Sequence, residues 1–144
     1  METLTVKLET INDKVRFNAS SRDNPELVID YFPPIGDGKG YTSLELLLAS
    51  FGSCVGSTLV TLLRYRLKKS VSGILIEAKG TAREEHPKSL ERILLSLKIK
   101  AADLEEKEVR EMLRVLEDSI CPVWAMIKGN VIVDVEIGIC EITA

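Results

Sequence analysis

LLLASFGSCVGSTLVTLL, residues 46–63, is a stretch without a charged side chain, and Cys54 lies at its centre. Apolar residues recur along it at spacings of three and four, which is typical of an α-helix with one apolar face. The stripe consists of Leu44, Leu48, Phe51, Val55, Leu59 and Leu62, and it is widened by Leu47, Cys54 and Leu63. The pattern predicts a helix that is covered on most sides, with the rest of the chain built around it.

The same stretch lies at the lower length limit of a membrane-spanning helix. Serine and threonine side chains are frequent in it, however, and they make it too polar for lipid to be its favoured surroundings. We therefore expect a buried helix and no membrane partner. Gly52 and Gly56 lie four residues apart and remove side-chain bulk, which should let another backbone approach closely.

The residues before the helix predict how it starts. A loop rich in proline and glycine occupies residues 33–40, and Thr42 or Ser43 suits the N-cap position. Glu45 would complete a capping box with Thr42. A helix over residues 43–69 would be roughly 40 Å long at about 1.5 Å per residue, whereas a compact monomer of this size has a radius of gyration of about 14 to 15 Å. We therefore expect a homodimer in which a partner covers the exposed part of the helix.

The other segments alternate between strand and helix patterns. Alternating apolar residues predict strands before and after the long helix, and amphipathic spacing from Asp103 to Ile120 predicts a second helix with Asp103 as its cap. Cys121-Pro122 should begin a short third helix, because proline suits a first turn. The predicted strands cover residues 3–8, 15–19, 27–31, 74–79, 92–99 and 131–139. This order indicates an α+β fold with two small antiparallel sheets in a single domain, residues 1–144.

Composition limits the possible functions. The chain has 144 residues and a net charge of −3, so it has no general attraction for phosphate, and we expect no nucleic-acid partner. Its alternating N-terminal residues do not resemble a signal peptide, which favours the cytoplasm. Three cysteines at wide spacing are not a disulfide framework. No cluster of histidine, cysteine and carboxylate residues predicts a metal site.

The cysteines are the candidate reactive groups. Cys121 is placed at a predicted helix start, where free N–H groups and the helix dipole stabilise a thiolate. Cys54 lies within an apolar helix and would need a basic group nearby in order to react. Cys140 falls on the polar face or the frayed end of the last strand, and we expect no role for it.

Three segments together resemble a known family. SLELLLASFGSC (43–54), EHPKSLERILLSLKIKA (85–101) and CPVWAMIKGNVIVDVEI (121–137) are similar to the osmotically inducible protein C and organic hydroperoxide resistance (OsmC/Ohr) family. The resemblance runs from about residue 27 to residue 139. It implies an intertwined homodimer with long central helices, and thiol-dependent reduction of organic hydroperoxides without a metal, flavin or other cofactor.

The resemblance also implies roles for individual residues. Cys54 would attack the peroxide, Cys121 would resolve the product as a Cys54–Cys121 disulfide, and an external dithiol would reduce that disulfide. Peroxidases of the family carry a glutamate ten residues before the first cysteine, where this chain has Leu44 followed by Glu45. They also carry an arginine near the first hairpin, for which Arg16 and Arg22 are the candidates here.

The sequence leaves a second interpretation open. The chain would then be a non-enzymatic OsmC-like dimer that senses redox state or binds a small apolar ligand in a pocket between its subunits. A purely structural role for both cysteines is a third alternative. Pairing of Cys54 with Cys121 after treatment with an organic hydroperoxide would separate the first interpretation from the others.

Overall fold

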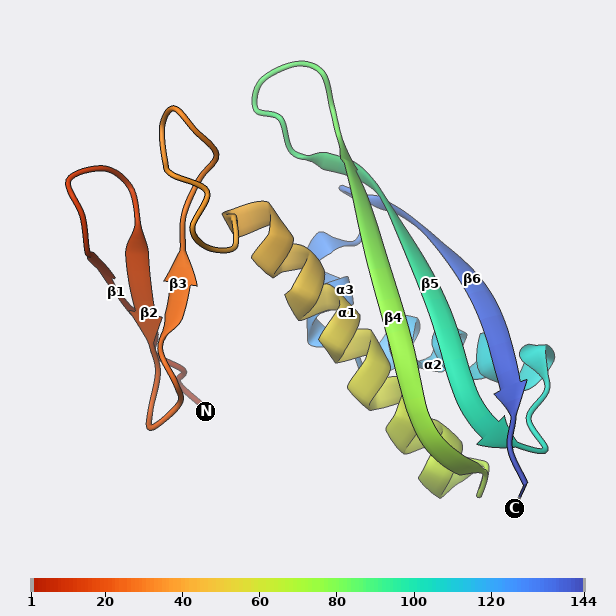
Figure 1. Cartoon of the computed structure of the whole chain (residues 1–144). Coiled ribbons are helices and arrows are strands. Elements are labelled where there is room, and N and C mark those ends of the chain that lie inside the picture. Colours follow the sequence, from red (N-terminus) through yellow and green to blue (C-terminus); the bar gives the residue numbers. More distant parts are fainter. Residues whose placement is uncertain (1, 144) are drawn as a thin grey trace. The chain divides into compact units, whose positions relative to one another are not determined.

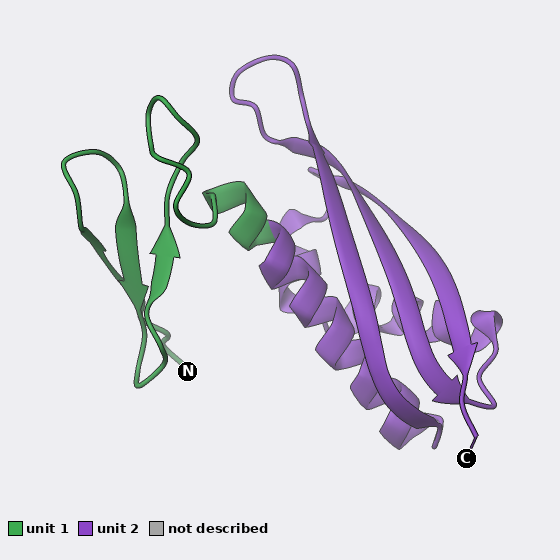
Figure 2. Ribbon diagram, in the orientation of Figure 1, with its two compact units in different colours: residues 1–47 green, residues 48–144 purple. Residues whose placement is uncertain are grey.

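The computed structural model describes residues 2–143, which form two three-stranded sheets, three α-helices and one π-helical turn (Figure 1). The chain divides into two compact units between Leu47 and Leu48 (Figure 2). Each unit contains one of the sheets. The predicted α+β class with two small sheets and a central cysteine-bearing helix is confirmed.

The first unit is built on a short antiparallel meander. Strands β1 (Lys7–Thr10), β2 (Phe17–Ser20) and β3 (Leu27–Ile29) pair in the order β1-β2-β3. The predicted meander is present, but its first strand lies at residues 7–10 and not at 3–8. This unit has almost no apolar core of its own. Of the sixteen large apolar side chains that are exposed in the described part of the chain, eleven belong to this unit. They are Leu4, Val6, Leu8, Ile11, Leu27, Tyr31, Phe32, Ile35, Tyr41, Leu44 and Leu47.

The central helix begins as its sequence predicts. Helix α1 spans Ser43–Thr61 and continues into the π-helical turn η1, Leu62–Arg66. The backbone N–H of Thr42 donates to Glu45 Oε1 at 2.8 Å, and the N–H of Glu45 donates to Thr42 Oγ1 at 3.2 Å. This reciprocal pair is the predicted capping box, which satisfies two N–H groups that a helix start leaves free.

The second sheet differs from the prediction in one strand. Strands β4 (Ser70–Ala82) and β5 (Leu90–Ala102) form the expected antiparallel hairpin, but β6 (Ile132–Glu141) pairs parallel to β5. The prediction of two purely antiparallel sheets is therefore wrong for this edge. Helices α2 (Glu106–Ser119) and α3 (Pro122–Ile127) connect β5 to β6, and such a long crossover returns the chain to the end where β5 began.

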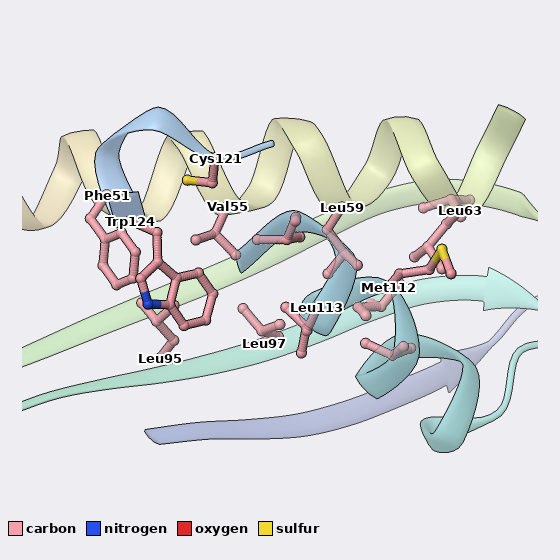
Figure 3. Packing of buried hydrophobic residues seen from close by; sticks show 14 of the residues in the cluster. Phe51, Val55, Leu59, Leu63, Leu95, Leu97, Met112, Leu113, Cys121 and Trp124 are labelled. Atoms are coloured by element: carbon pink, nitrogen blue, oxygen red, sulfur yellow. The ribbon is translucent and has the colours of Figure 1, made fainter. Parts of the chain in front are cut away.

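The core of the second unit lies between these helices and one face of the sheet (Figure 3). Alternate residues of β5, among them Leu95, Leu97 and Ile99, are buried and pack with the apolar faces of α1 and α2. From α1 and η1 the fully buried members are Phe51, Val55, Leu59 and Leu63. Among the described residues, the segment Ser43–Arg66 has the length and composition of a membrane span, but its inner face belongs to this core.

The two glycines of α1 face the sheet. A Cβ on Gly56 would lie 2.6 Å from Cδ1 of Ile76 in β4, and a Cβ on Gly52 would lie 3.7 Å from Cγ2 of the same residue. The predicted close approach is therefore present, but its partner is a strand side chain of the same chain. The glycine pair carries no evidence for a contact between helices.

The start of α2 also differs from the prediction. Asp103 has a φ of 55° and a fully exposed side chain, so it does not cap the helix. Glu105 takes the N-cap position instead and forms a capping box with Glu108. The N–H of Glu105 donates to Glu108 Oε1 at 3.0 Å, and Glu108 also binds Lys69 at 3.2 Å. The N-cap therefore lies two residues later than the sequence suggested.

Candidate dithiol site

Cys54 and Cys121 lie in direct contact within the second unit. The Sγ of Cys121 donates a hydrogen bond to the Sγ of Cys54 at 2.9 Å. Cys54 is a half-buried residue of α1, whereas Cys121 is 2% exposed at the junction of α2 and α3. Two cysteines that are 67 residues apart in the sequence thus form one site.

Backbone hydrogen bonds fix Cys121 on both sides. Its N–H donates to the carbonyl of Leu116 in α2 at 2.8 Å, and its own carbonyl accepts from the N–H of Ala125 in α3 at 3.1 Å. Cys121 is the N-cap of α3, and Pro122 follows it at the first helical position, where a missing N–H costs nothing. The sequence therefore determines locally where the Cys121 sulfur is presented.

The ionisation of Cys121 is opposite to what its helix-start position predicted. Burial, followed by the hydrogen bond that it donates to Cys54, raises the pKa of the Cys121 thiol to about 11. Hydrogen bonds from the N–H groups of Trp124 and Val123 act in the other direction, but they are the weaker effect. The expectation of a partly ionised Cys121 is wrong, because its sulfur is buried and hydrogen-bonded to Cys54.

The hydrogen bond also makes the two sulfurs unequal. Cys121 keeps its proton at neutral pH and is the donor, so Cys54 is the acceptor. A sulfur nucleophile reacts as the thiolate, so Cys121 is a weak nucleophile while it is buried and holds its proton.

Two aromatic rings pack beside the thiol pair. Phe51 of α1 and Trp124 of α3 meet edge to face, with ring centroids 5.3 Å apart and an interplanar angle of 86° (Figure 3). Each ring lies three residues from one of the cysteines. Edge-to-face pairs add to the stabilisation from burial, so this contact holds α3 against α1 at the point where the sulfurs meet.

The candidate arginine Arg16 lies in the first unit and is held by two carboxylates. Its Nε lies 3.3 Å from Asp30 Oδ2, and its Nη2 lies 3.0 Å from Asp37 Oδ2. Lys14 binds the other oxygen of Asp37 at 2.7 Å, which gives a compact network of two cations and two anions. The positive charge of Arg16 is thus balanced within its own unit.

Sequence reasoning did not identify Asp30 and Asp37. Asp30 is buried, and its carboxylate accepts hydrogen bonds from the N–H groups of Tyr31, Asp37 and Lys39. Burial alone would raise its pKa, but these three bonds and Arg16 outweigh it and lower the pKa to about 2. The only sequence signal for Asp30 was its position at the end of an apolar strand. Its partners could not be identified from the sequence, because they are up to fourteen residues away along the chain.

The remaining candidates also lie in the first unit. Glu45 is engaged in the capping box with Thr42, so its carboxylate has a structural role at the helix start. Arg22 occupies the turn between β2 and β3 with a φ of 54°, and together with Lys7 it lines a pocket of about 420 Å³.

Cys140 is exposed on β6, in the second unit, as expected. Among residues 2–143, no group of three or more metal-ligating side chains comes together.

The fold is α+β, and a long helix and a crossover bring two cysteines into contact. The chain belongs to the family of OsmC-like proteins, whose family model matches residues 36–136. No curated protein matches it.

Solved structures share the fold along nearly the whole chain. A hypothetical protein from Aquifex aeolicus VF5 is 28% identical, with a TM-score of 0.84 over 99% of this chain and 100% of that one. An OsmC-like protein from Mycoplasma pneumoniae is 19% identical, with a TM-score of 0.80 over 97% and 99% of the two chains. The organic hydroperoxide resistance protein OhrB of Bacillus subtilis is 18% identical, with a TM-score of 0.63 over 96% and 98%.

Proposed function

We propose that the chain is a thiol-dependent peroxidase that reduces organic hydroperoxides to alcohols. The single observation that carries this proposal is the 2.9 Å contact between an accepting Cys54 sulfur and a protonated, buried Cys121. Membership of the OsmC-like family and the fold shared with hydroperoxide resistance proteins support a peroxidase-like role.

The proposed reaction uses the two sulfurs in turn. The Cys54 thiolate attacks the distal oxygen of the hydroperoxide, the O–O bond breaks, and the alkoxide leaves and takes up a proton as the alcohol. Cys54 is then a sulfenic acid. The Cys121 sulfur attacks it, the S–S bond forms, and water leaves with the Cys121 proton. An external dithiol reduces the disulfide by exchange and restores both thiols.

We also propose that the functional unit is a homodimer. The first unit exposes most of the large apolar side chains of the described chain and has almost no core of its own. Apolar surface of this extent marks an interface in soluble proteins. A second copy is the simplest cover, because symmetric dimers are the commonest oligomers.

Peptide mapping under non-reducing conditions tests the proposed reaction. After one equivalent of cumene hydroperoxide, the peptides that contain Cys54 and Cys121 should be joined and should separate on reduction, while Cys140 stays free. Recovery of both peptides as free thiols, with the hydroperoxide unconsumed, would contradict the proposal.

Two observations favour a second candidate function. Asp30 and Asp37 balance the charge of Arg16, and Leu44 stands where the family peroxidases carry glutamate. A non-catalytic dimer that binds a small apolar ligand, or senses redox state through the same cysteines, would need no activating arginine. Rapid catalytic turnover of hydroperoxide with an excess of dithiol would rule this candidate out.

A further inference from the structure

The reduced sulfurs of Cys54 and Cys121 have a binding capacity that the peroxidase reaction does not use. Both cysteines are free thiols, and their sulfurs lie 2.9 Å apart. Cys140 is also free, but it is exposed on strand β6 and makes no such contact in the described chain. The chain therefore presents one dithiol and one single thiol, and a ligand that bonds two sulfurs at once distinguishes between them.

Within the described chain, the thiol pair has no third metal ligand beside it. Across residues 2–143, no three histidine, cysteine or carboxylate side chains come together at one point. Both cysteines instead pack with apolar core residues, among them Phe51, Val55 and Trp124 (Figure 3). A structural zinc ion takes four protein ligands, and a catalytic one takes three. The pair therefore does not suit zinc, but it suits an atom that completes its bonding with two sulfurs and one group of its own.

The distance between the sulfurs selects among the soft atoms that thiolates prefer. Copper(I) or mercury(II) with two thiolates is linear, so its sulfurs lie on opposite sides of the ion, and this pair would have to separate widely. Trivalent arsenic is pyramidal, and its two bonds to sulfur meet at close to a right angle, so the sulfurs stay near neighbours. The 2.9 Å contact therefore suits trivalent arsenic better than a linear ion.

Regular structure holds both sulfurs near this arrangement. Cys54 is held within α1, and the backbone N–H of Cys121 donates to the carbonyl of Leu116 in α2. The edge-to-face contact of Phe51 with Trp124 joins α1 to α3 beside the pair. Positions that are fixed before binding reduce the entropy that a ligand must overcome. Half-buried Cys54 receives the ligand first, and buried Cys121 closes the second bond.

We propose that Cys54 and Cys121 of the reduced protein form a binding site for a trivalent arsenical, R–As(OH)₂, in which R is an alkyl or aryl group. Each thiol replaces one hydroxyl group. Two As–S bonds form, two As–O bonds break, and the thiol hydrogens leave with the hydroxyl groups as two water molecules. Arsenic stays trivalent, so the step needs no oxidant or reductant. The inference goes beyond the proposed peroxidase function, because it requires only that both sulfurs are reduced.

Phenylarsine oxide, the dehydrated form of the phenyl compound, is the probe. It is added in equimolar amount to the reduced protein together with glutathione, which removes arsenic that is bound through one sulfur only. Intact-mass spectrometry should show one phenylarsenic group per chain in wild type and in Cys140→Ser. Cys54→Ser and Cys121→Ser should each bind the probe at least about a hundredfold more weakly, because a second linked contact raises affinity by about 10² to 10⁴.

A further sample separates loss of the dithiol from loss of the fold. Cys140→Ser, oxidised with diamide until no free thiol remains, keeps Cys54 and Cys121 but has no thiol to bond arsenic. It should bind none until a reductant reopens the disulfide. Arsenic on this oxidised sample, equal binding by wild type and either serine variant of the pair, or no arsenic on reduced wild type would overturn the inference. A wild type that binds the probe but consumes no hydroperoxide would contradict the peroxidase proposal alone.

Discussion

The Cys121 sulfur lies 2.9 Å from the Cys54 sulfur and donates a hydrogen bond to it. A disulfide bond is about 2.05 Å long, so the pair closes with a movement of less than about 1 Å. Helix α1 supplies one sulfur, and the junction of α2 and α3 supplies the other. The reduced protein is therefore already arranged for the second step of the proposed reaction.

The raised pKa of Cys121 predicts a loss of stability in alkali. Its ordinary pKa of 9.0 rises to about 11 in the folded chain, so the folded state holds this proton more tightly than the unfolded state. The resulting stabilisation is fully present below pH 9 and disappears as the pH rises to 11. Between these limits, wild type should lose about 2 kcal/mol more unfolding free energy than Cys121→Ala. Urea titrations at each pH provide the measurement, and parallel curves for the two proteins would contradict the prediction.

The contact between Gly56 and Ile76 predicts a graded packing response. Gly56→Leu should cost about 1 to 3 kcal/mol, because the larger side chain has no room beside β4. Gly56→Ala meets only the terminal methyl of Ile76, and Ile76→Val removes that methyl. The double variant Gly56→Ala/Ile76→Val should therefore lose less unfolding free energy than the sum of the losses of the two single variants. Gly73→Ala is the control, because a Cβ there meets no described atom within 4 Å. Additive effects measured by urea unfolding would show that the two residues do not compete for space.

The fold was predictable where the deciding interactions are local. The capping box of Thr42 and Glu45 follows from residues three apart, and the hairpin of β4 and β5 follows from alternation around a turn. The parallel pairing of β6 was not predictable. The residues of β6 do not indicate whether the two helices before it place the strand parallel or antiparallel to β5. Similarly, Gly56 predicts that another group packs closely against α1, but the sequence does not indicate which one. The structure shows that this group is the side chain of Ile76.

Asp30 predicts a destabilisation of the first unit in acid. Its folded pKa of about 2 lies below the ordinary 3.8, so it contributes stability above pH 3.8 that is lost as the pH falls through 2. Asp30→Asn should remove this dependence. At neutral pH it should lower Tm by several degrees, because the N–H groups of Tyr31, Asp37 and Lys39 lose a charged acceptor.

Hydrogen exchange locates the effect of this substitution. In Asp30→Asn the amides of residues 31, 37 and 39 should exchange faster, whereas Asp23→Asn, in the exposed turn before β3, should leave them unchanged. Unaltered protection in Asp30→Asn would mean that the carboxylate does not organise this loop.

The exposed apolar side chains of the first unit predict a dimer in solution. Light scattering at micromolar concentration should give twice the chain mass of 16.0 kDa. Leu8→Glu places a charge on this surface and should weaken association at least tenfold, whereas Leu75→Glu alters an exposed residue of β4 and should not. A folded wild-type monomer would contradict the dimer proposal.

The candidate site was only partly predictable, because some of its properties depend on contacts between residues far apart in the sequence. Cys54 and Cys121 stand out as residues, and the resemblance pairs them, but the ionisation of Cys121 depends on tertiary burial and not on its helix start. Arg16 was a candidate, yet its partners Asp30 and Asp37 come from a strand end and a loop that the hairpin pattern does not connect to it. Local signals identified the reactive atoms, and long-range contacts set their properties.

The most direct test of the peroxidase account is to trap its intermediate. In Cys121→Ser the resolving sulfur is absent, so one equivalent of cumene hydroperoxide should leave a sulfenic acid on Cys54 that dimedone labels once per chain. Cys54→Ser should consume no hydroperoxide, and Cys140→Ser should behave as wild type. Mass spectrometry of the labelled peptides reads the outcome. Dimedone on Cys54 is the predicted result. Label on Cys121 in Cys54→Ser, or no label on Cys54 in Cys121→Ser, would contradict the assignment of Cys54 as the attacking thiol.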